Sequence, residues 1–121
     1  MREMQYLCLV YHDEREWDAQ STSEYDELVG EILAYREFLR SSGHLVAANS
    51  LQHSHMATTL RVRNGNMSVT DGPFAETKEQ LGGFFLVEAR DIDEACEVAS
   101  RFPPARIGTI EVRPVQELRH S

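Results

Sequence analysis

The stretch from residue 70 to residue 85 carries the residues best placed to do chemistry. It reads TDGPFAETKEQLGGFF and sets an Asp-Gly-Pro turn, a run of charges and a glycine pair between two segments with the composition of strands. A desolvated carboxylate at a strand end, such as Asp71, has a raised pKa and can exchange protons near neutral pH. The structural alternative is an Asx-turn, in which the carboxylate accepts backbone N–H groups. Both interpretations stay open.

Other residues of this stretch could hold a ligand. Gly72 and Pro73 suit a sharp turn, because before a proline only glycine reaches extended conformations with positive φ. Lys78 could pair with an anion, although Glu76 and Glu79 beside it favour a solvated loop.

Two arginines and the glycine pair add to the candidates. Arg61 and Arg113 lie on polar strand faces and could hold a carboxylate or phosphate through two parallel hydrogen bonds. The alternative is pairing with Glu111 or another surface acid. The pair Gly82-Gly83 predicts a β-bulge, or a close approach of another backbone or a ligand.

Histidines are the remaining acid/base candidates. His44 opens a predicted strand, from which its ring could approach the Asp71 loop, so we take it as the candidate catalytic partner of Asp71. His53 and His55 would point to one side of an extended segment, but they lack an identifiable third ligand, and we expect no metal site. There is no glycine-rich phosphate loop or nucleophile elbow in the sequence, and we expect no cofactor.

Length and charge narrow the class of protein. A chain of 121 residues predicts a single domain over residues 1–121. The net charge of −8 argues against binding to nucleic acid or anionic membranes, although a local basic pocket could still take an anionic ligand. Without a signal peptide or a run of about 20 apolar residues, we expect a cytoplasmic protein. Cys8 and Cys96 match no disulfide or zinc pattern and are interpreted as buried core thiols.

Periodicity places these residues on secondary structure. The hairpin is the most secure element, because Asn64-Gly65 favours a two-residue turn that pairs Leu60 with Val69, Val62 with Met67, and Arg61 with Ser68. Capping patterns at Ser21 and Asp91 begin the two predicted helices. The predicted elements, in order, are a strand at 5–11, a helix from 21 to about 40, a strand at 44–51, hairpin strands at 58–63 and 66–70, a strand at 84–89, a helix from 91 to 102, and a strand at 109–113.

This order predicts an α+β fold, a ferredoxin-like βαββαβ sandwich with an inserted β-hairpin. Two helices cover only one face of the sheet, yet the first strand and the strand at 84–89 are apolar on both faces. We therefore expect a homodimer that packs sheet against sheet through the open face. A ligand cleft would lie between the sheet and the Asp71 loop.

The sequence also resembles the YciI-related superfamily, specifically the branch with the Asp-Gly-Pro-Phe motif. The matching segments are residues 71–84, Glu88–Asp91, Glu94-Ala95 and Gly108–Pro114. The resemblance implies a dimeric α/β barrel of ferredoxin-like fold and a His–Asp pair, with the histidine on the first helix. This chain has no histidine between Asp13 and Gly43.

Two hypotheses about function follow. The leading one is a small homodimer that binds a small polar molecule in a cleft beside Asp71, with acid/base chemistry by Asp71 and His44. The resemblance implies the rival, because genes of this branch often neighbour those of extracytoplasmic-function sigma factors: a non-catalytic interaction protein that regulates or accompanies such a factor.

Overall fold

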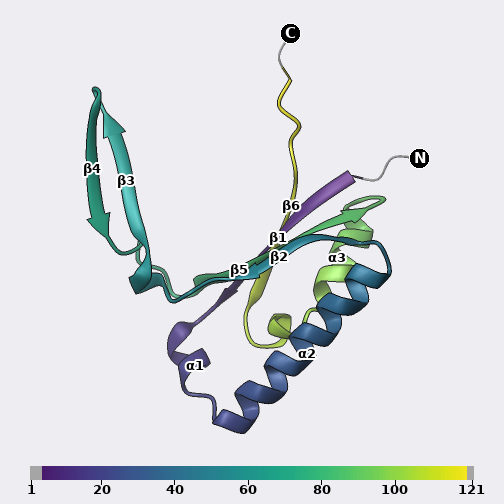
Figure 1. Cartoon of the computed structure of the whole chain (residues 1–121). Coiled ribbons are helices and arrows are strands. Elements are labelled where there is room, and N and C mark those ends of the chain that lie inside the picture. The colour runs from purple at the N-terminus through teal and green to yellow at the C-terminus, as the bar shows by residue number, and fades with distance from the viewer. Residues whose placement is uncertain (1–3, 120–121) are drawn as a thin grey trace.

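The structure is a computed structural model that describes residues 4–119. The described residues form a four-stranded sheet, three α-helices and a separate two-stranded hairpin that extends away from the sheet (Figure 1). The elements are β1 (Met4–His12), α1 (Glu14–Asp18), α2 (Thr22–Ser41), β2 (Leu45–Ser50), β3 (Thr58–Arg63), β4 (Asn66–Asp71), β5 (Gln80–Ala89), α3 (Ile92–Ser100) and β6 (Thr109–Pro114), with short 3-10 turns at Ser54–Met56 and Pro103–Arg106.

The main sheet has the strand order β2-β5-β1-β6, and its neighbouring strands are antiparallel. Both α2 and α3 lie on one face of it (Figure 1). The predicted α+β class is confirmed, and the topology is compatible with a ferredoxin-like fold.

Local signals set the ends of the long helices. The Ser21 hydroxyl accepts from the backbone N–H of Glu24, and the Glu24 carboxylate accepts from that of Ser21, which completes the predicted capping box. Asp91 caps α3 by accepting from the N–H of Glu94. These caps satisfy helix N–H groups that have no partner within the helix.

The core lies between the central strands and the two long helices. Cys8 of β1 and Phe85 and Val87 of β5 are almost fully buried. Leu39 of α2 and Ala95 of α3 pack against this layer. The alternating burial along β1 and β5 follows from the period-two direction of strand side chains.

The hairpin has the predicted register throughout. Asn64 and Gly65 both have positive φ, 52° and 78°, as a two-residue hairpin turn requires. β3 pairs with β4 as Leu60 with Val69, Val62 with Met67, and Arg61 with Ser68. The hairpin rises from the end of β2 on the side of the sheet away from the helices (Figure 1).

The structure differs from two predictions. The predicted elements include no helix between the strand at 5–11 and the helix from 21, yet Asp13 accepts from the N–H of Arg15 and begins α1. A five-residue helix is too short to show a hydrophobic period. Cys8 is buried as predicted, but Cys96 is exposed, because it lies one residue beyond Ala95 and off the buried face of α3.

Within residues 4–119, no helix combines the length and the hydropathy that crossing a bilayer would need.

Candidate functional site

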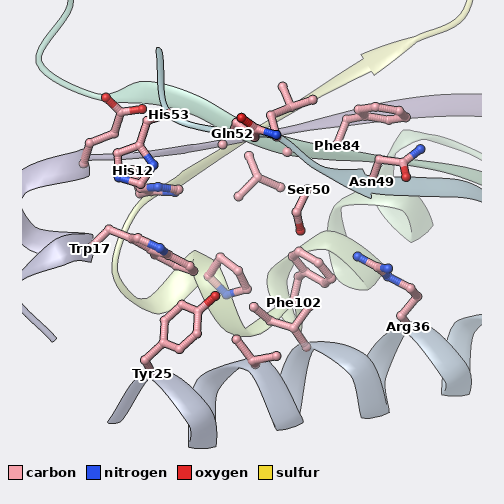
Figure 2. A pocket seen from close by; sticks show the side chains of 18 of the residues that line it. His12, Trp17, Tyr25, Arg36, Asn49, Ser50, Gln52, His53, Phe84 and Phe102 are labelled. Atoms are coloured by element: carbon pink, nitrogen blue, oxygen red, sulfur yellow. The ribbon is translucent and has the colours of Figure 1, made fainter. Parts of the chain in front are cut away.

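A cavity of about 330 Å³ lies between α2 and the end of the sheet where β1, β2 and β5 meet (Figure 2). Its polar lining residues lie at its two ends and along β2, and apolar side chains line the walls between them. The lining includes Val10, His12, Glu14, Trp17, Tyr25, Ile32, Arg36, Asn49, Ser50, His53, Gly82, Gly83 and Phe102.

His12 is the buried polar group of this cavity. It ends β1, its residue is only 8% exposed, and its Nδ1 atom is buried without a hydrogen-bond partner. Burial lowers the pKa of His12 below its ordinary value, and the nearby Glu14 carboxylate opposes this only in part. The ring is therefore neutral at neutral pH, and its Nδ1 atom has no partner within the described residues.

Trp17 holds the His12 ring in place. The two rings stack with centroids 4.4 Å apart and planes inclined at 22°. Tyr25 of α2 meets the indole edge-on at 6.0 Å. This aromatic group closes one end of the cavity (Figure 2).

A β-bulge makes room for the imidazole. The pairing of β1 with β5 steps from Val10–Gly83 to Tyr11–Leu81, which leaves Gly82 as an extra residue. A methyl group on Gly82 would overlap the His12 ring. The neighbouring Gly83 approaches the β2 backbone, since a Cβ there would lie 2.9 Å from the Asn49 carbonyl oxygen. The glycine pair thus serves both predicted roles, a bulge and a close backbone approach.

The loop after β2 is tied to α1 beside His12. The Glu14 carboxylate accepts hydrogen bonds from the backbone N–H and the hydroxyl of Ser54, both at 2.7 Å. The Nε2 atom of His53 lies 2.7 Å from a carboxylate oxygen of Asp18. Among residues 4–119, no three His, Cys, Asp or Glu side chains gather closely enough to hold a metal ion.

Arg36 stands at the opposite end of the cavity. Its side chain extends from α2 toward β2 near Asn49, with Phe102 between it and His12 (Figure 2). Its Nε atom is buried and has no hydrogen-bond partner. Each end of the cavity is therefore lined by a residue with a buried nitrogen that has no hydrogen-bond partner.

The structure places the predicted catalytic residues apart. Asp71 ends β4 on the projecting hairpin and is exposed. His44 precedes β2, where its Nδ1 lies 2.9 Å from the Ser42 hydroxyl and its Nε2 lies 3.8 Å from Glu94. Within one chain, the structure does not bring His44 and Asp71 together, and neither lines the cavity.

The predicted ligand residues also lie outside this cavity. Gly72 has the expected positive φ, 96°, and its N–H donates to the Ala57 carbonyl at 2.6 Å. Arg113 pairs with Glu111 at 3.2 Å, as the structural alternative predicted. The remaining ligand candidates are exposed side chains of the hairpin and the loop after it, namely Arg61, Pro73 and Lys78.

Sequence reasoning missed His12, Trp17 and Arg36. A signal existed for Arg36, which follows Ile32 by four residues and so falls on the apolar face of α2. A charged residue on such a face indicates a cavity or a buried partner. His12 gave a weaker signal, as the residue that directly follows the predicted strand at 5–11.

Comparison with known proteins confirms the predicted resemblance at the level of the YciI-related family. The family model of the YCII-related domain matches residues 4–119. An uncharacterized protein of Rhizobium meliloti (strain 1021), R00369, is 38% identical over 114 residues, which cover 93% of this chain and 92% of that protein. The chain belongs to the YCII-related family.

Proposed function

We propose that this protein binds a small molecule in the cavity between α2 and the sheet, and that His12 exchanges a proton or a hydrogen bond with it there. The observation that carries this proposal is His12 itself, a largely buried imidazole that lines the cavity and whose Nδ1 atom has no hydrogen-bond partner.

The energetics support a ligand at this position. Leaving a buried polar group without a hydrogen bond costs about 1–3 kcal/mol, and nearly all such groups in proteins have partners. A ligand that gave the His12 ring a hydrogen-bond partner would recover that cost. Because burial lowers the pKa of His12, the neutral ring can accept a proton from a bound molecule.

The aromatic group gives the ring a fixed orientation. Stacking on Trp17 restricts rotation of the imidazole, and the bulge at Gly82 leaves the space that the ring occupies. A positioned base is more effective than a mobile one, because orientation is fixed before the reaction. This arrangement supports His12, rather than His44, as the acid/base residue, and it moves the proposed cleft away from Asp71.

A fragment screen followed by NMR tests the proposal. Neutral and anionic fragment-sized compounds are screened by thermal shift, and each hit is mapped through the His12 ring and the Trp17 indole N–H signals. We expect hits to move both signals, and we expect His12→Asn to weaken their binding. His55→Asn is the matched control, because His55 is exposed and outside the cavity lining. Hits that cluster around Asp71 and leave His12 unmoved would contradict the proposal.

We further propose that two chains associate through the open face of the sheet. This face carries apolar side chains from both central strands, paired as Leu9 with Phe84 and Leu7 with Leu86, and all four are only partly buried. The hairpin rises on the same side (Figure 1) and adds an apolar face of its own. Its four exposed apolar side chains are Leu60, Val62, Met67 and Val69. Apolar surface on this scale favours burial against a second copy.

A further inference from the structure

The two ends of the cavity differ in charge. The His12 end has the Glu14 carboxylate in its lining and the Asp18 carboxylate bonded to His53 beside it. At the other end stands Arg36, which is the one Arg or Lys among the lining residues that the structure describes. An elongated molecule with a negative group at one end would therefore bind in one orientation.

Arg36 differs from most other arginines of the chain. Seven arginines within residues 4–119 form ion pairs with Asp or Glu, namely Arg15, Arg40, Arg90, Arg101, Arg106, Arg113 and Arg119. Arg36 forms none among the same residues, and its buried Nε lacks even a neutral acceptor. Exposed Arg61 and Arg63 can be hydrated by solvent, whereas the buried Nε of Arg36 cannot.

The chemistry of the guanidinium group indicates which ligand group would pair with Arg36. Its planar N–H groups match the two oxygens of a carboxylate, which bind it through two parallel hydrogen bonds. Asn49 and Ser50 of β2 line the same cavity and could share hydrogen bonds with such a group. A carboxylate here would pair with the Arg36 guanidinium and neutralise its partly buried charge.

The side chains that line the middle of the cavity indicate that the rest of the ligand is apolar. Val29 and Ile32 of α2 and Phe102 after α3 line it. These side chains offer contact to a hydrocarbon chain or an aromatic ring and no hydrogen bonds. The volume of about 330 Å³ is at the lower end of the roughly 300–1,000 Å³ range of small-molecule sites.

From these features we infer that the cavity takes a small carboxylic acid with an apolar body. The carboxylate binds Arg36, the body lies over Ile32 and Phe102, and the far end of the molecule meets the His12 ring. This inference rests on the proposed function and adds the chemical class of the ligand and the residue that selects it.

The test compares acids with neutral compounds of the same shape. Benzoate and hexanoate are titrated into the intact protein beside benzamide and hexanamide, with calorimetry for affinity and NMR signals of the Arg36 Nε–H, the His12 ring and the Trp17 indole N–H for location. We expect each acid to bind about tenfold or more tightly than its amide, because a charged hydrogen-bonded pair is replaced by a neutral one. The acids should move the Arg36 Nε–H signal.

Two variants identify the residue responsible. Arg36→Gln should remove the preference for the acid, and Arg36→Lys should restore part of it by returning the charge without the planar fork. Arg40→Gln is the control, because Arg40 lies one turn further along α2, pairs with Glu37 and is outside the cavity lining. It should keep the full preference.

The outcomes separate this inference from the proposed function. Equal affinity for acids and amides, with His12 and Trp17 signals still moving, would overturn the carboxylate inference and leave the proposed cavity function standing. A preference that survives Arg36→Gln would also overturn it. If no acid or amide moves the cavity signals, both proposals are wrong.

Discussion

The imidazole of His12 stacks on the indole of Trp17, with ring centroids 4.4 Å apart and planes inclined at 22°. His12 ends β1 and Trp17 lies on α1, so the turn capped by Asp13 brings the two rings together. Trp17 is the only tryptophan of the chain, which makes its emission a direct probe of His12.

The fluorescence of Trp17 should report the protonation of His12. A protonated imidazole in contact with an indole quenches its emission, and a neutral one quenches it less. Because burial lowers the pKa of His12 below 6.5, we expect the emission to fall on acidification with a midpoint below pH 6.5. A fluorescence titration measures this midpoint, and His12→Asn should abolish the transition. A midpoint at or above 6.5 would contradict the burial of the ring.

The same burial should make stability depend on pH. The folded pKa of His12 is lowered, so between that value and the ordinary value of 6.5 the unfolded state binds more protons than the folded state. The contribution of His12 to the free energy of unfolding is therefore fully present above pH 6.5 and is lost as the pH falls below it. Urea denaturation at a series of pH values gives the free energy of unfolding at each pH. Below pH 6.5 this free energy should fall less steeply with pH in His12→Asn than in the wild type. Equal slopes would count against this linkage.

Gly82→Ala should disturb the His12 ring. The added methyl group would overlap the imidazole, which Trp17 prevents from moving freely, and such overpacking costs about 1–3 kcal/mol. Denaturant unfolding measures the loss of unfolding free energy in Gly82→Ala. Adding His12→Ala to the same chain should recover part of that loss, and the difference gives the coupling energy between the two sites.

Gly30→Ala is the matched control for this substitution. A Cβ at Gly30 meets nothing within 4 Å, and the residue lies on the exposed side of α2. Alanine there should stabilise the protein by about 0.5–1 kcal/mol, because it favours the helix over glycine. If both substitutions destabilised equally, steric overlap with His12 would not be the cause.

Leu9→Glu should convert a dimer to monomers if the open sheet face is the interface. Leu9 pairs with Phe84 at the centre of that face, and a carboxylate there would be buried without a partner. Light scattering after size-exclusion chromatography gives the mass of each species. Ile107→Glu, at an exposed loop position, should leave the mass unchanged. A wild-type monomer at high concentration would show that the face is not an interface.

The features that depend on neighbours along the chain can be predicted from the amino-acid sequence alone. The capping box needs only Ser21 and Glu24, and the hairpin register follows from Asn64-Gly65 and the alternation on either side of it. Such interactions form between residues a few positions apart, so their pattern is visible without the fold. The α+β order followed from the same local signals.

The position of the candidate site depends on packing between segments that are distant in the sequence. His12, Arg36 and Asn49 come from three elements separated along the chain, and the cavity exists because α2 packs across the strand ends at a bulge. The distinctive Asp71 loop lies on a hairpin that leaves the sheet, so its chemistry is not joined to His44 within the chain. Burial and missing partners are properties of packing between distant segments, and the local sequence pattern does not record them.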